Sequence, residues 1–122
     1  MKTAVVYWSG TGNTETMAAA MAEGAKDAGA EVELLTVDKA EAAALSEAKA
    51  FALGCPAMGA EELEEGEMEP FMAELDSRIA GKTIALFGSY GWGDGQWMRD
   101  WEERMKAAGA EIVGGEGVIC ME

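Results

Sequence analysis

Apolar residues along this chain follow two spacings that alternate from one segment to the next. Strands are expected at residues 4–8 and 50–54, which are short apolar runs, and at residues 32–37 and 83–88, which are rich in apolar residues. A fifth strand is expected at residues 110–113, with residues 118–121 as a further candidate for it. Strands separated by helices predict an α/β fold with a parallel sheet and right-handed crossovers.

The segments between these runs carry apolar residues at helical spacing. Residues 40–45 are rich in alanine and predict a short helix. The three longer helices are marked by Met17, Met21, Gly24 and Ala28, ending at Gly29; by Met68, Phe71, Met72 and Leu75, with Pro70 in the first turn; and by Trp97, Met98, Trp101, Met105 and Ala108, before Gly109. Residues 1–122 contain no internal repeat, low-complexity linker or domain boundary, so one domain is expected.

Three loops of unusual composition follow the first, third and fourth predicted strands. A doubly wound parallel sheet binds its ligand beyond the carboxyl ends of its strands, so these loops are expected to meet at one site. In the first loop, glycines and hydroxyl groups stand directly before a helix, and such a loop can hold a phosphate without Lys or Arg. Its residues are Ser9, Gly10, Thr11, Gly12, Asn13 and Thr14.

Other interpretations of the first loop stay open on composition alone. It could be an ordinary glycine-rich turn with a Ser or Thr cap. A Walker loop does not fit, because no Gly-Lys-Ser/Thr follows. A dinucleotide fingerprint is weak: Gly10 and Gly12 fit, but Glu15 stands at the third glycine position, although Asp38 could act as the ribose-binding acid.

Charge and composition exclude or disfavour several classes of function. A net charge of −14 argues against nucleic acid as a partner and suits a partner with a basic docking face. The simpler interpretation is that the charge serves solubility alone.

The residues available for catalysis or metal binding are few. The chain has no His, which is the usual general base and metal ligand, so hydrolase chemistry is less expected. Cys55 and Cys120 are too few for a disulfide framework or a zinc site. Without a membrane-spanning run or a signal peptide, the cytoplasm is the expected location.

The three loops, in this order, resemble the flavin-binding loops of flavodoxins, above all the short-chain flavodoxins of anaerobic bacteria. Residues 9–14 resemble the phosphate loop, residues 54–61 the second flavin loop and residues 87–95 the third. The resemblance runs in register from the first strand to about the fifth. It implies a flavodoxin-like, doubly wound, five-stranded parallel sheet in the order 2-1-3-4-5, with noncovalently bound FMN at the switch point.

The resemblance also implies roles for individual residues. Met58 and Trp92 should flank the two faces of the isoalloxazine, and Glu61 should accept a hydrogen bond from flavin N3–H. Trp8 is expected to shield the phosphate or ribityl chain, while backbone groups of residues 89–91 should meet the pyrimidine edge. The residues implied to bind FMN are Trp8, Ser9, Gly10, Thr11, Gly12, Asn13, Thr14, Cys55, Pro56, Ala57, Met58, Gly59, Ala60, Glu61, Ser89, Tyr90, Gly91, Trp92 and Gly93.

Further expectations concern Cys55, two tryptophans of the last predicted helix, and the backbone at Gly59. Cys55 is expected to be a small buried filler, and Trp97 and Trp101 are expected to pack in the core. In the family, the peptide after Gly59 turns its carbonyl toward flavin N5 upon one-electron reduction. Gly59 suits the positive φ that a type II′ turn needs, so this sequence favours that conformation.

A low-potential one-electron carrier, not an enzyme, is the function that the resemblance implies. An anionic phosphate and loops without Lys or Arg oppose further negative charge on the flavin, which makes the fully reduced flavin a strong reductant. Redox proteins of the ferredoxin-linked kind would dock at the acidic flavin edge. One alternative is a flavodoxin-like NAD(P)H-dependent FMN or quinone reductase, but the sequence has no basic residues placed to bind the phosphate of NADP. Another is a detached FMN module of a larger reductase.

The last expectation concerns the end of the chain. In the family a helix follows the fifth strand and packs beside the first helix, whereas this chain stops at Glu122. Five strands and four helices are therefore expected, with the sheet face over strands three to five partly bare. A bare apolar face favours self-association.

Overall fold

The computed structural model describes residues 2–8, 12–40, 45, 48, 50–56, 66–90, 95–113 and 117–121 of the chain. Their strands form one sheet in which every pairing is parallel, in the order β2-β1-β3-β4-β5, with β6 also paired to β4. This confirms the predicted strand order. The strands are β1 (Lys2–Tyr7), β2 (Glu31–Thr36), β3 (Ala50–Gly54), β4 (Thr83–Tyr90), β5 (Glu111–Ile112) and β6 (Val118–Met121).

The last two strands share one edge of the sheet. Thr83 pairs with Glu111 in β5, and Phe87 pairs with Val118 in β6. Residues 83–87 of β4 pair with β3 on their other side, so β5 and β6 must lie along the same free edge. Residues 110–113 and 118–121 therefore contribute to one strand position, as the sequence predicted.

The expected boundary of β4 was wrong by two residues. Residues 89 and 90 were assigned to a loop, but Ser89 and Tyr90 continue the strand and pair with Cys120 and Met121. The physical reason is that β6 supplies partners for the backbone groups of these two residues. A partner about thirty residues later in the chain leaves no sign in the local pattern.

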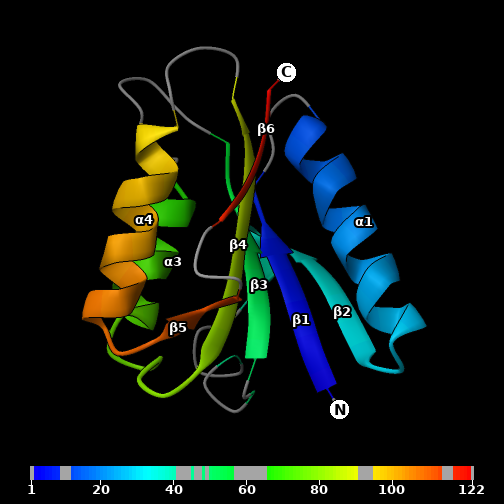
Figure 1. Cartoon of the computed structure of the whole chain (residues 1–122), viewed down its shortest axis with the longest axis horizontal. Coiled ribbons are helices and arrows are strands. Elements are labelled where there is room, and N and C mark those ends of the chain that lie inside the picture. The colour runs from blue at the N-terminus through cyan, green and yellow to red at the C-terminus, as the bar shows by residue number, and fades with distance from the viewer. Residues whose placement is uncertain are drawn as a thin grey trace.

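Helices cover both faces of this sheet (Figure 1). Helix α1 (Asn13–Asp27) lies on one face, and α3 (Met68–Leu75) and α4 (Gln96–Ala107) lie on the other. A short 3-10 helix, η1 (Val37–Lys39), follows β2. Gly29 ends α1 as expected, with a φ of 93° and an N–H that donates to the carbonyl of Lys26. Of the predicted helix at residues 40–45, all but the two end residues lie outside the described ranges.

Alternate strand residues build two cores. Val6, Leu53 and Leu86 point toward α3 and α4 and pack in the larger cluster, which also contains Trp97 and Trp101. Val5, Ala52 and Phe87 point toward α1 and form a smaller cluster. This alternation is the period of two that a sheet imposes on its side chains.

The face that carries α1 is hollowed beside this helix, over β1, β3 and β4. An apolar cavity of about 330 Å³ lies there, floored by the small side chains of Ala50, Ala52 and Ala85 and walled by Met21 on α1. Val113, at the rim, is 53% exposed. The expected bare face over strands three to five, and self-association through it, stay predictions. Within the same residues, no helix has the length and apolar character needed to cross a membrane.

Candidate cofactor site at the carboxyl edge of the sheet

The carboxyl ends of β1 and β3 lie beside β4 at one edge of the sheet. Tyr7 at the end of β1 pairs with Gly54 at the end of β3, and Gly54 pairs with Phe87 in β4. Two hydrogen bonds extend this pairing past the strands: Trp8 N–H donates to the Gly54 carbonyl over 3.0 Å, and Cys55 N–H donates to the Phe87 carbonyl over 3.1 Å. The bases of the three predicted loops are thereby brought to one edge, as the parallel topology requires.

Helix α1 starts at this edge with an N-terminus that suits an anion. Its N-cap is Gly12, which adopts a left-handed φ of 96° and gives no side-chain cap to the first turn. A helix N-terminus carries partial positive charge and backbone N–H groups that point outward. Glu15 in the first turn is exposed and opposes an anion, so the N–H groups rather than the net charge of this turn must provide the attraction.

A buried pair of hydroxyl groups lies directly behind this helix start. Thr14 Oγ1 and Ser89 Oγ are 3.0 Å apart and form a hydrogen bond between α1 and β4. Both residues were predicted to contact the cofactor, but their contact with each other was not. The pair ties the base of the first loop to the base of the third.

Glycines allow the base of the second loop to pack tightly against β4. A Cβ at Gly88 would overlap the carbonyl oxygen of Cys55, and a Cβ at Gly54 would overlap the ring of Phe87. Each overlap involves either backbone or a fully buried ring that cannot move aside easily. The close approach of β3 and β4 at this edge therefore depends on these two residues having no side chain.

Trp97 lies beneath the second and third loop bases. Its indole Nε1–H donates to the Cys55 carbonyl over 3.1 Å, and its ring is 5.7 Å from that of Tyr90, measured between centroids. The expected core packing of Trp97 and Trp101 is confirmed, since each is 1% exposed. The expected burial of Cys55 is confirmed as well. Sequence reasoning missed the hydrogen bond, although a buried indole N–H usually needs an acceptor and could have suggested one.

Trp8 leaves β1 toward the start of α3. It is half-buried against the larger core, and its indole N–H donates to Glu67 Oε1 over 3.3 Å. Thus Trp8 stands at the predicted edge, where it contacts the residue just before α3. Eleven of the predicted cofactor residues lie outside the described residues: Ser9, Gly10, Thr11, Ala57, Met58, Gly59, Ala60, Glu61, Gly91, Trp92 and Gly93.

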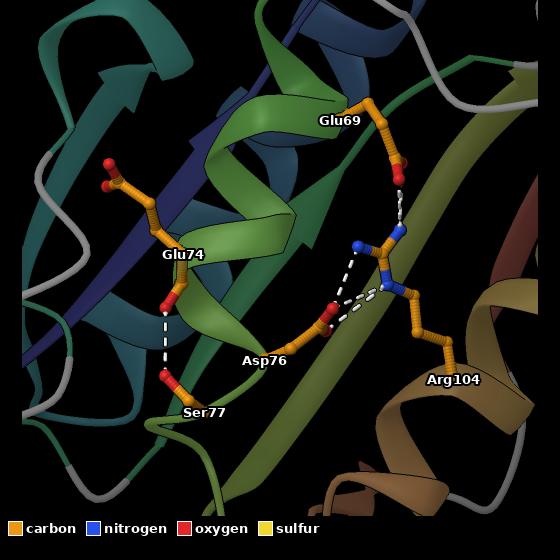
Figure 2. Close-up of polar contacts among 5 residues, drawn as sticks. All are labelled: Glu69, Glu74, Asp76, Ser77 and Arg104. Carbon is orange, nitrogen blue, oxygen red and sulfur yellow. Dashed lines mark hydrogen bonds and ion pairs between the residues drawn. The ribbon is translucent and has the colours of Figure 1, made fainter.

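An arginine joins the two helices on the opposite face of the sheet from α1 (Figure 2). Arg104 on α4 places Nε and Nη2 on the carboxylate of Asp76 and Nη1 on that of Glu69, with closest contacts of 2.8 Å to each residue. Burial lowers the pKa of Arg104, but hydrogen bonds and charges from Asp76 and Glu69 outweigh it and raise the pKa above its ordinary value. This contact was not predicted, because its partners lie 28 and 35 positions away.

Carboxylates make the field at this edge negative. Burial raises the pKa of Tyr7 at the end of β1, and the charges of Glu15 and Asp38 raise it further. Among the described residues, no three His, Cys, Asp or Glu side chains are grouped so that they could hold a metal ion. The start of α1 at this edge offers backbone N–H groups to a bound group, and Glu15 and Asp38 place negative charge near it.

Comparisons with known proteins agree with this arrangement. The profile of the flavodoxin family matches residues 5–122. A flavodoxin from Clostridium beijerinckii is 52% identical over 109 residues, which cover 89% of this chain and 79% of the relative. A flavodoxin from Megasphaera elsdenii is 46% identical over 110 residues, covering 90% and 80%. The solution structure of the two-electron reduced Megasphaera elsdenii flavodoxin matches 98% of this chain and 84% of its own, with a TM-score of 0.88 and 42% identity.

Proposed function

This chain belongs to the flavodoxin family, and we propose that the three loops after β1, β3 and β4 hold its FMN at the carboxyl edge of the sheet. Members of this family are electron carriers that use FMN, and the protein is accordingly an electron-transfer protein rather than an enzyme. The alternative of an NAD(P)H-dependent reductase is not favoured by these relatives.

The observation that supports the proposed site is the start of α1. Gly12 leaves the first turn without a side-chain cap, and the hydroxyl groups of Thr14 and Ser89 lie behind it. The N–H groups of this turn suit a terminal phosphate in a loop that has no Lys or Arg, while the buried Thr14–Ser89 hydrogen bond ties the helix start to β4. The residues present therefore fit FMN, and residues 9–14 would hold its phosphate.

The other two loops would hold the flavin ring. Met58 and Trp92 would flank it, Glu61 would accept from N3–H, and backbone groups of residues 89–91 would meet the pyrimidine edge. When bound, FMN supplies the electron transfer by accepting and releasing electrons one at a time. The protein's part is to bind the ring between apolar walls and to set the electrostatic field around it.

That field favours a low reduction potential. The three loops contain no Lys or Arg, and the whole chain has a net charge of −14. Adding negative charge to a flavin beside an anionic phosphate and carboxylates is opposed by Coulomb repulsion. The fully reduced protein should thus be a strong reductant.

The same charges indicate the chemistry of the partners. Three exposed carboxylates lie near this edge. Glu15 is in the first turn of α1, Asp38 follows β2, and Glu67 accepts a hydrogen bond from Trp8. This edge would attract redox proteins that have a basic face around their own cofactor, and the attraction would raise their association rate. Proteins that exchange electrons with ferredoxin are among them. Nucleic acid is not a partner that such a surface would attract. A cytoplasmic location stays a prediction from the sequence.

The test is a comparative flavin titration of the apoprotein. We expect one FMN per chain, detected by quenching of flavin fluorescence, and an affinity for riboflavin that is weaker by roughly tenfold or more, because riboflavin lacks the charged phosphate. Equal affinities for the two flavins would overturn the phosphate-loop assignment. Oxidation of NADH or NADPH by the FMN-loaded protein alone would instead support the reductase.

A further inference from the structure

Two loop bases that the proposed function places around the flavin ring are joined by one buried side chain. Cys55 is the first residue after β3, and Tyr90 is the last residue of β4. Trp97 contacts both: its indole N–H donates to the Cys55 carbonyl over 3.1 Å, and its ring lies 5.7 Å from that of Tyr90 between centroids.

The position of Trp97 in the chain strengthens this link. It is the second residue of α4, whose N-cap Gly95 directly follows the segment leaving β4. The helix start that receives the third loop thus carries the side chain that holds the second loop. A displacement of Trp97 would move both loop bases together.

The packing around this contact leaves little freedom. Trp97 is 1% exposed and Cys55 is fully buried. A Cβ placed on Gly88 would lie 3.1 Å from Trp97 Cζ2 and would overlap the Cys55 carbonyl oxygen. The indole, the carbonyl and the β4 backbone are therefore packed at contact distance, which favours a single arrangement of the loop bases.

We propose that Trp97 is a positioning residue for the flavin ring: its hydrogen bond to the Cys55 carbonyl sets the spacing between the second and third loops. This inference rests on the proposed function, in which those loops enclose the ring. Trp97 acts through Cys55 and Tyr90 rather than by touching the cofactor. Its loss should alter the affinity and the potential of bound FMN by changing the width and angle of the ring slot.

The chain offers a matched control one helical turn away. Trp101 lies on the same helix, is also 1% exposed, and belongs to the same core cluster. Within the described part of the chain, its indole Nε1 has no hydrogen-bond partner. Replacing either tryptophan by phenylalanine makes the same chemical change in the same core, but only Trp97→Phe removes the hydrogen bond to Cys55.

The experiment compares Trp97→Phe with Trp101→Phe in FMN affinity and in the two one-electron midpoint potentials of bound FMN. We expect Trp97→Phe to weaken FMN binding by about threefold to tenfold more than Trp101→Phe, the scale of one buried hydrogen bond. We also expect it to shift the midpoint potentials where Trp101→Phe leaves them near wild type. Equal effects of the two substitutions on affinity and potentials would overturn the inference.

A second pair of variants covers a failure of Trp97→Phe to fold. Replacing each tryptophan by β-(3-benzothienyl)alanine keeps the ring volume and removes only the N–H donor. In the apoprotein, amide hydrogen exchange at Cys55, whose N–H donates to the Phe87 carbonyl, should become faster for the analogue at position 97 and not for that at position 101. Unchanged exchange of the Cys55 amide in the protein with the analogue at position 97 would overturn the inference, even if wild-type protein binds FMN. Faster exchange in a protein that binds no FMN would overturn the proposed function alone.

Discussion

The hydroxyl oxygens of Thr14 and Ser89 lie 3.0 Å apart in the interior, although 75 positions separate the two residues in the sequence. Thr14 has no exposed surface, and Ser89 is 2% exposed. Among the described residues, they are the only polar or charged residues that are buried. Because one belongs to the first turn of α1 and the other to the end of β4, their hydrogen bond joins the proposed phosphate end of the site to the proposed ring end.

A double-mutant cycle should show that these hydroxyl groups are coupled. Thr14→Val and Ser89→Ala should each lower the free energy of unfolding by about 1 kcal/mol, and the double variant should lose less than the sum, with a coupling near 1 kcal/mol. Urea unfolding of the apoprotein measures all three. Thr16→Val is the control, because the Thr16 hydroxyl donates to the Gly12 carbonyl at an exposed position. Strictly additive losses at positions 14 and 89 would show that the two residues act independently.

The Arg104 contact should stabilise the packing of α3 on α4. The planar guanidinium reaches Asp76 with two nitrogens and Glu69 with a third, whereas a lysine ammonium cannot span both carboxylates. Since these groups are partly exposed, we expect Arg104→Lys to lower the free energy of unfolding by about 1 kcal/mol, and less at high salt. Arg99→Lys on the exposed side of α4 is the control. A loss of the same size in both variants, or none in either, would contradict this assignment.

Tyr7 should make the protein less stable in alkali. Its pKa is raised in the folded state by burial and by the charges of Glu15 and Asp38, so the unfolded chain ionises first. The contribution of a group with a raised pKa is fully present below its unfolded value of about 10 and is lost as the pH rises through the folded value. The measurement compares the free energies of unfolding of wild type and Tyr7→Phe from pH 8, roughly two units below that value, into strong alkali. Above about pH 10, the free energy of unfolding should fall more in wild type than in the variant. A constant difference across this range would show that Tyr7 titrates alike in both states.

Local patterns predicted most of the described helices and strands, because the apolar spacing that marks each of them lies within its own segment. The apolar residues Met68, Phe71, Met72 and Leu75 face the core of α3 as their spacing required. Gly29 ended α1 through its left-handed backbone. Strand order followed from the family resemblance and was confirmed by the pairing of β2, β1, β3, β4 and β5.

The site was predicted less completely, because its contacts join distant parts of the chain. The loop motifs identified Thr14 and Ser89 one at a time, yet no local pattern could show that they meet. Helical spacing correctly placed Trp97 in the core, but the acceptor of its N–H is a backbone carbonyl 42 positions away. The boundary of β4 failed for the same reason, since the pairing of Ser89 and Tyr90 depends on β6.

The central claim is that this fold carries FMN and separates its reduction into two one-electron steps, and an anaerobic redox titration of the FMN-loaded protein tests it most directly. The account predicts two resolved steps in the flavin absorbance, with the second midpoint potential below that of free FMN, because the net charge of −14 and loops without Lys or Arg oppose the last negative charge. Raising the ionic strength should lessen that difference. A single two-electron step at the potential of free FMN would contradict the account.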